Sequence, residues 1–267
     1  MSPAEQLQDL LAHADDPRPP DPEEPLRFSR LKLFSKSAAH FVGQPPGDSS
    51  SMDIGSAAHS MLLGGQRVVG YLPGKKRQGK EFDQFEKDNA GAIVLTASEY
   101  RRADAMARAV RDNPLAMRVL DGVRETTYTW RVQKRLCRGT PDVRGNDFIT
   151  ELKTGETADP RFFPYKMRRF CYHGQLAWYT DGATLAGLPT PEQHYIVAVE
   201  AAPPFVVTVF RVSPSAIDIG RRLYRLWFEQ LEACAAADAW PGYCQSVVEL
   251  DLPGEGFEIE DAGEEAA

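Results

Sequence analysis

The amino-acid sequence predicts an α/β protein with a central mixed β-sheet flanked by helices and an N-terminal helical elaboration. Three observations support this prediction. Helical spacing of apolar residues dominates the first 120 residues, strand-like patterns begin at Thr126, and a helix and two further strands precede a long final helix. Strands joined by a tight turn pair antiparallel, whereas strands separated by a helix commonly pair parallel. A sheet of mixed direction is therefore expected.

The N-terminal part is expected to be helical. Ser29 and Ser98 are residue types that favour the position before a helix, where a hydroxyl oxygen accepts a hydrogen bond from a free backbone N–H. The expected helices cover residues 30–35, 51–63, 81–90 and 98–120.

Strand patterns dominate the second half of the sequence. Three strands are expected at residues 126–136, 139–143 and 147–154, forming an antiparallel meander with a hairpin turn at 144–147. An aromatic amphipathic helix over residues 162–180 follows, and then two apolar strands at 193–201 and 205–212. Ser213 and Pro214 are expected to open the last helix, which runs to about Ala237.

The charge of the chain is unevenly distributed. Net charge is -7, but residues 1–25 hold seven acids and one base, and residues 249–267 hold eight acids and no base. Residues 26–248 therefore carry 23 acids against 30 bases. A basic body permits a polyanionic partner, although acidic ends are also common solubilising segments.

Composition suggests four segments and a cytoplasmic protein. No apolar run approaches the roughly 20 residues that a membrane span needs, and the acidic N-terminus lacks a signal-peptide pattern. The expected segments are a disordered acidic, proline-rich leader (1–25), a helical part carrying His59 (26–122), an α/β core (123–248) and an acidic tail (249–267).

The most informative residues are Asp142, which follows Pro141, and the pair Glu151 and Lys153 nine to eleven positions later. Residues two apart on a strand share one face, so Glu151 and Lys153 project together while Leu152 points into the opposite layer. The intervening hairpin turn reverses the chain. It can therefore bring Asp142 beside Glu151.

This set of side chains suits the hydrolysis of a phosphodiester bond. The reaction needs neutralised phosphate charge and an activated water, which two carboxylates and Mg²⁺ or Mn²⁺ can supply. Asp142 and Glu151 are the expected metal ligands, and Lys153 can orient or deprotonate the attacking water. The alternative is a turn aspartate followed by a surface ion pair, which would contribute little.

Two further features extend the candidate site. Gln175 and Tyr179 lie four residues apart on the helix after the Glu151 strand, so they share a face. Core packing of Tyr179 would explain the same spacing. His59 follows the small residues 55–58, which allow its helix to approach another backbone closely, and its imidazole suits Mn²⁺ as well as a purely structural role.

Together these residues resemble the RecB-like branch of the PD-(D/E)XK nuclease superfamily, and within it the exonuclease VIII (RecE-type) nuclease domains of phages and prophages. The resemblance implies a restriction-endonuclease-like core. It implies that Gln175 and Tyr179 belong to the catalytic site, and that His59, Asp142, Glu151 and the carbonyl of Leu152 bind the metal. It also implies a 5′ to 3′ exonuclease of phage-type DNA recombination that acts on ends of double-stranded DNA, a homo-oligomer, and a single-strand annealing protein as partner.

Three residues outside this set have two interpretations each. Glu125 precedes the first strand and either helps to bind a second metal, as an acid near this place does in relatives, or is a solvated strand-end residue. Arg77 and Lys80 lie in a basic, glycine-rich segment that either contacts DNA phosphates or is a soluble loop.

Two other functions remain open from the sequence alone. The first is an endonuclease of restriction or repair type, which shares the core but usually needs additional base-reading elements. The second is a catalytically silent DNA-binding relative. The presence of Asp142, Glu151 and Lys153 together argues against it.

Overall fold

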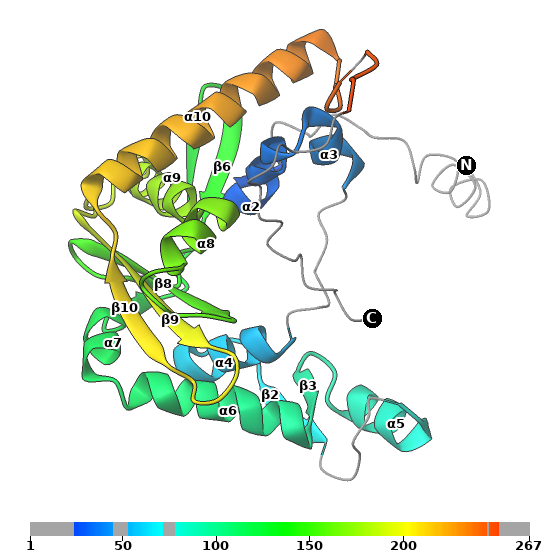
Figure 1. Cartoon of the computed structure of the whole chain (residues 1–267), viewed down its shortest axis with the longest axis vertical. Coiled ribbons are helices and arrows are strands. Elements are labelled where there is room, and N and C mark those ends of the chain that lie inside the picture. The colour runs from blue at the N-terminus through cyan, green and yellow to red at the C-terminus, as the bar shows by residue number, and fades with distance from the viewer. Residues whose placement is uncertain (1–23, 45–52, 72–77, 245, 251–267) are drawn as a thin grey trace.

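The fold is taken from a computed structural model of the chain, which describes residues 24–44, 53–71, 78–244 and 246–250 (Figure 1). Nearly all of the expected leader (1–25) and acidic tail (249–267) lie outside the described residues, as does Arg77. No helix among the described residues is long and apolar enough to cross a membrane.

A five-stranded mixed sheet forms the centre of the molecule. Its mixed direction is as the sequence predicts, but one edge strand is residues 123–124, and the expected meander is wrong because the strands formed from residues 126–139 lie in a separate sheet. Strands β8 and β9 pair in parallel, and the other neighbours pair antiparallel. The order across the sheet is β10 (Val207–Arg211), β9 (Gln193–Glu200), β8 (Phe148–Gly155), β7 (Val143–Arg144) and β4 (Val123–Arg124).

Two smaller sheets were not expected. The expected strand at 126–136 is divided in two, because Gln133 adopts a left-handed conformation (φ 54°) that turns the chain between β5 and β6. Strand β6 also pairs in parallel with β1, whereas the expected strand at 139–143 is reduced to β7 and a preceding loop. The bounds of the smaller sheets are β1 (Leu26–Arg27), β6 (Arg135–Gly139) and β5 (Tyr128–Val132) in one, and β2 (Val68–Tyr71) and β3 (Ile93–Thr96), which are parallel, in the other.

Helices cover both faces of the central sheet (Figure 1). On one side lie α8, α9 and α10, and on the other lie α4, α6 and α7. The helices of the described residues are α2 (Phe28–Leu31), the 3-10 helix η1 (Lys32–Ser35), α3 (Ala38–Gly43), α4 (Asp53–Leu63), α5 (Lys80–Asp88), α6 (Ala97–Arg111), α7 (Pro114–Val119), α8 (Phe163–Phe170), α9 (Tyr172–Leu185) and α10 (Pro214–Ala237).

Both predicted serine caps in the N-terminal part are wrong. Ser29 lies inside α2, where the residue before the helix makes no side-chain cap. Ser98 lies inside α6, which is capped two residues earlier than expected because Thr96 and Glu99 form a reciprocal capping box. Asn113 then caps a separate helix, α7, that opens with Pro114. Proline fits a first helical turn and breaks a helix interior, so the expected helix 98–120 divides there.

The expected helix 162–180 also divides into two. Cys171 has a left-handed conformation (φ 58°) and separates α8 from α9. The backbone therefore changes direction between the two helices, and α9 continues to Leu185. Ser213 caps α10, as expected.

Two hydrophobic cores lie on the two sides of β8. Ile149 belongs to the core around α9 and α10, whereas Leu152 belongs to the core around α4 and α6. Leu26 and other residues before position 43 pack into the first core. The helical part and the catalytic part of the sequence therefore share both cores.

Candidate active site

Strand β8 presents Glu151 and Lys153 on its α9 side, with Leu152 buried on the other side. The carboxylate of Glu151 is almost completely buried, with 1% of the residue exposed. Lys153 donates a hydrogen bond from Nζ to Glu151 Oε2 at 2.8 Å. The pair is thus enclosed and does not form an ordinary surface ion pair.

The loop before β7 places Asp142 directly beside Glu151. The backbone N–H of Asp142 donates to Glu151 Oε1 at 3.1 Å, and Asp142 Oδ2 accepts from the N–H of Leu152 at 2.7 Å. Backbone and side chain of Asp142 are therefore both tied to β8. The hairpin turn brings these residues together as the sequence predicts.

His59 reaches the same point from α4. Its Nε2 lies 3.0 Å from Asp142 Oδ1. The helix comes close to the end of β8 because Gly55 has no side chain: a Cβ there would lie 2.7 Å from Thr154 Oγ1. The small residues before His59 therefore permit the close approach that was expected of them.

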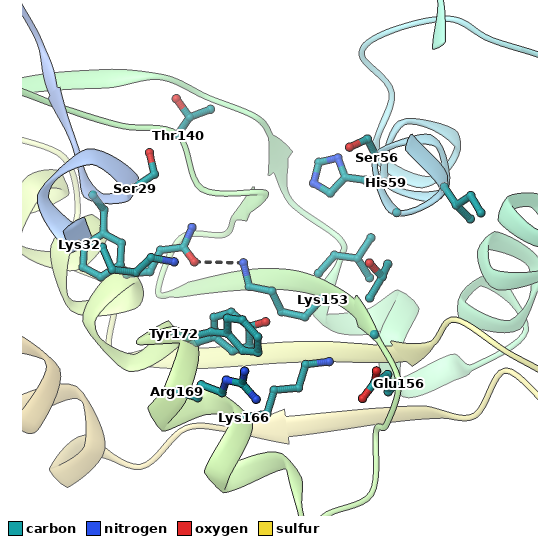
Figure 2. A pocket seen from close by; sticks show the side chains of 18 of the residues that line it. Ser29, Lys32, Ser56, His59, Thr140, Lys153, Glu156, Lys166, Arg169 and Tyr172 are labelled. Carbon is teal, nitrogen blue, oxygen red and sulfur yellow. Dashed lines mark hydrogen bonds between the residues drawn. The ribbon is translucent and has the colours of Figure 1, made fainter. Parts of the chain in front are cut away.

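Gln175 and Tyr179 connect to the site through Lys153. Lys153 Nζ donates to Gln175 Oε1 at 3.0 Å, the contact dashed in Figure 2, and Gln175 Nε2 donates to Tyr179 Oη at 3.0 Å. The Tyr179 ring packs closely over Gly139, where a Cβ would approach it to 2.9 Å. The ring of Tyr172 lies 4.9 Å from Lys153 Nζ. These side chains fix the ammonium group from several directions.

Glu125 also lies at the edge of this cluster. Its Oε1 is 3.6 Å from His59 Nδ1, and its backbone N–H donates to the carbonyl of Asp142 at 3.0 Å. Glu125 has a positive φ of 48°, an uncommon conformation for a residue with a side chain. Its side chain is 39% exposed, so its carboxylate is accessible to solvent.

The cluster places two buried carboxylates between the imidazole of His59 and the ammonium of Lys153. Burial and the charge of Asp142 raise the pKa of Glu151 to about 7, although Lys153 opposes this. Burial would also raise the pKa of Asp142, but the hydrogen bond from His59 and the charge of Lys153 lower it below its usual value. Burial disfavours the charged forms of His59 and Lys153, yet the neighbouring carboxylates raise the pKa of both.

The donor set fits a divalent cation. Asp142 and Glu151 are buried so close together that one raises the pKa of the other, a repulsion that a bound cation would relieve. Carboxylate oxygens suit Mg²⁺, and an imidazole adds a ligand that Mn²⁺ accepts. Among the described residues no three His, Cys, Asp or Glu side chains form a ready metal cage, and His59 and Asp142 contact each other directly.

A cleft of about 1930 Å³ opens in front of these residues. Lys153, His59 and Tyr172 face it from different elements (Figure 2). Lys80, which begins α5, is not among the described residues that line this cleft. Basic and aromatic lining residues that sequence reasoning missed are Arg27, Lys32, Arg138, Phe162, Tyr165, Lys166, Arg169, Phe170 and Tyr172. The alternation of rings and cations over residues 162–170 was the available signal.

Comparisons with known proteins agree with this geometry. No curated protein matches the chain. A solved structure of a "putative exonuclease" from Eubacterium rectale is similar in fold, with a TM-score of 0.60 at 13% sequence identity, over 95% of this chain and 96% of that one. A family model described as a PDDEXK-like domain of unknown function (DUF3799) matches residues 27–251. The chain therefore belongs to this family, within the PD-(D/E)XK superfamily.

Proposed function

We propose that this protein is a metal-dependent DNA exonuclease that hydrolyses phosphodiester bonds at the ends of linear double-stranded DNA. The enclosed cluster of Asp142, Glu151 and Lys153 carries this proposal, because it combines metal-binding carboxylates with a fixed ammonium group at the base of a wide cleft. Membership of the PDDEXK-like family supports a nuclease.

Each residue has a role that follows from its position. Asp142, Glu151, His59 and the carbonyl of Leu152 would hold Mg²⁺ or Mn²⁺, which when bound neutralises phosphate charge and increases the acidity of a water. Lys153, held by Glu151 and Gln175, orients the attacking water. Tyr179 is a positioning residue, since it contacts Gln175 and not Lys153.

We further propose that the enzyme degrades DNA in the 5′ to 3′ direction, as an exonuclease of phage-type recombination. Its support is the resemblance to RecE-type domains and the description of the structural neighbour as a "putative exonuclease". On this proposal the protein acts as a homo-oligomer and hands a 3′ overhang to a single-strand annealing protein. Arg77 and Lys80 remain proposed DNA contacts, and of the two Lys80 belongs to the described residues and does not line the cleft.

Digestion of end-labelled linear duplex and of covalently closed circular DNA tests the proposal. With Mg²⁺ or Mn²⁺ the linear duplex should lose nucleotides from its 5′ ends while the closed circle persists, and chelation should stop the reaction. Asp142→Asn should be inactive while its circular dichroism spectrum stays that of the wild type. Cleavage of the closed circle would identify an endonuclease, and absence of any metal-dependent cleavage would identify a silent relative.

A further inference from the structure

Helix α8 exposes three large aromatic side chains to the cleft. Phe162, just before the helix, is 56% exposed, Tyr165 is 74% exposed and Phe170 is 40% exposed. All three line the cleft in front of Lys153. Exposed rings that gather in one concave place, and not singly on a convex surface, indicate a binding site.

These rings are not needed to hold α8 in place. The opposite side of the helix carries Phe163, which is 2% exposed and stacks on Phe210 with ring centroids 4.4 Å apart. Met167 packs beside the same core. Phe163 and Met167, four residues apart, share the anchoring face, whereas Tyr165 and Arg169, also four apart, share the exposed face.

Two cations lie among the exposed rings. Lys166 and Arg169 line the cleft on the same side of α8, and the Arg169 guanidinium lies 5.7 Å from the Phe170 ring centroid. Lys166 Nζ occupies the space into which a side chain at Gly155 would project, at the end of β8. Figure 2 shows Lys166 and Arg169 on the same wall of the cleft as Tyr172. Burial lowers the pKa of Lys166, and nearby Glu156 partly offsets this.

The exposed row continues to the active site. Phe170 stacks on Tyr172, with centroids 5.7 Å and planes 17° apart, and Tyr172 lies 4.9 Å from Lys153 Nζ. The left-handed Cys171 between the two aromatic residues turns the chain so that their rings meet. A flexible chain bound along these rings would therefore end at the catalytic lysine.

We propose that the row of Phe162, Tyr165, Lys166, Arg169 and Phe170, here named the α8 row, binds the unpaired end of a DNA strand. Bases would stack on the rings and phosphates would contact Lys166 and Arg169. Every base has a ring face that stacks on aromatic side chains once it is unpaired, whereas bases inside a duplex are already stacked on each other. The inference deepens the proposed function and rests on it for DNA as the ligand.

Charge favours this occupant over a second copy of the chain. The described residues that line the cleft include six lysines and arginines but only two carboxylates, Glu99 and Glu156. A second copy would bring the same positive charge to the same cleft, whereas a nucleic-acid strand brings a phosphate with each base.

Fluorescence anisotropy with labelled oligothymidylate tests the inference. The full chain is used in the presence of a chelator, so that binding is read without cleavage. Phe162→Ala and Tyr165→Ala should each weaken binding at least about 5-fold, the scale of one lost stacking contact, and Tyr165→Trp should retain it. Lys166→Ala should weaken binding and reduce its salt dependence.

One control ligand and two control variants accompany this measurement. A duplex whose two ends are closed by hairpins offers no unpaired end, so Phe162→Ala and Tyr165→Ala should leave its binding unchanged. Arg168→Ala changes an exposed arginine beside the row that does not line the cleft, and Tyr243→Ala removes an exposed ring elsewhere. Both variants should bind the oligothymidylate as the wild type does. Circular dichroism confirms that all variants fold.

Three results would overturn the inference. In the first, Phe162→Ala and Tyr165→Ala both bind the oligothymidylate as tightly as the wild type does. In the second, the two variants lose as much affinity for the closed duplex as for the oligothymidylate. In the third, they change the oligomeric state in sedimentation but not the binding of oligothymidylate. Failure of the proposed function gives a different pattern. In that case the wild type does not cleave linear DNA with metal, although binding of the oligothymidylate still depends on the rings.

Discussion

The two sides of strand β8 are packed with different kinds of side chain. The core around α9 and α10 contains buried Trp130, Trp178 and Trp227 together with several phenylalanines and tyrosines. The buried members of the core around α4 and α6 are alanine, leucine, methionine and valine. Both cores border the same candidate site. The residues of the site are therefore held partly by elements packed on an aromatic core and partly by elements packed on an aliphatic core.

The difference indicates how each support positions its functional groups. On the aromatic side Lys153 is fixed by a chain of hydrogen bonds through Gln175 to Tyr179. On the aliphatic side His59 is placed by close backbone approach, which Gly55 permits. Side-chain polarity should therefore matter most on one side, and side-chain volume on the other.

Lys153→Ala should give the largest effect. Removing the ammonium should reduce cleavage by about 10²- to 10⁴-fold, the range of a lost proton-transfer or water-orienting group, without opening a core cavity. End-labelled duplex digestion measures the rate. Lys134→Ala, at an exposed turn, is the matched control. A fully active Lys153→Ala variant would show that Lys153, and the hydrogen bonds through Gln175 to Tyr179 that hold it, do not contribute to cleavage.

Protonation of His194 tests the aromatic side through stability. Its ring bonds to Thr180 Oγ1 of α9 at 2.8 Å, and burial, with Arg221 nearby, lowers its pKa to about 4. Between about pH 4 and 6.5 the unfolded chain therefore binds more protons at this residue, so its contribution to stability is lost as pH falls. From about pH 7 to 5 the loss should be about 2 kcal/mol.

The measurement is urea unfolding of wild type and His194→Gln at both pH values. The difference between the two proteins is the relevant quantity, because the raised pKa of Glu151 changes stability with pH in the opposite direction in both. The pH dependence of the wild type minus that of His194→Gln should show the loss at low pH. Parallel curves would mean that His194 is not buried in its neutral form.

His59→Ala tests the aliphatic side. The Mg²⁺ or Mn²⁺ concentration for half-maximal cleavage should rise by roughly 10-fold or more, because a proposed ligand to the metal is lost. Thermal unfolding without metal should change little. His40→Ala, on α3 and outside the cleft lining, should leave the metal titration unchanged. An unchanged titration of His59→Ala would make His59 a structural histidine.

The smallest effect is expected from Gly55→Ala. The added Cβ would meet Thr154 Oγ1 and push α4 away, so the metal requirement should rise a few-fold, equivalent to roughly 1 kcal/mol of coupling between the two positions. Thr154→Ala alone should be nearly neutral, and the double variant should recover the wild-type titration. Additive effects of the two substitutions would show that close approach does not position His59.

The sequence predicted the central sheet and the cluster around Asp142 because both depend on short-range patterns. Alternation on one strand placed Glu151 opposite Leu152, and a tight turn at residues 144–147 set how far the chain could travel before Asp142 met Glu151. The proximity of His59 followed from a resemblance and from the small residues of its helix.

Other features could not be predicted because they depend on contacts between distant residues. The pairing of β1 with β6 joins Leu26 to Cys137, which no local pattern indicates. Helix ends were missed where a stronger capping residue competed, as with Thr96 over Ser98. The cleft-lining role of residues 162–170 was hidden because exposed rings in an amphipathic helix are easily assigned to a core.

The left-handed break at Cys171 has a consequence for how this fold can diversify. Helix α8 ends before α9 begins. Beyond the first turn of α9, which carries Gln175 and Tyr179, the backbone hydrogen bonds of that helix therefore involve no residue of α8. On the proposed role of the α8 row, exchanging its exposed residues for those of a relative, with Phe163 and Met167 kept, should therefore change ligand preference while the groups around Lys153 keep their places. The break lets the exposed side of α8 vary independently of the helix that carries Gln175 and Tyr179.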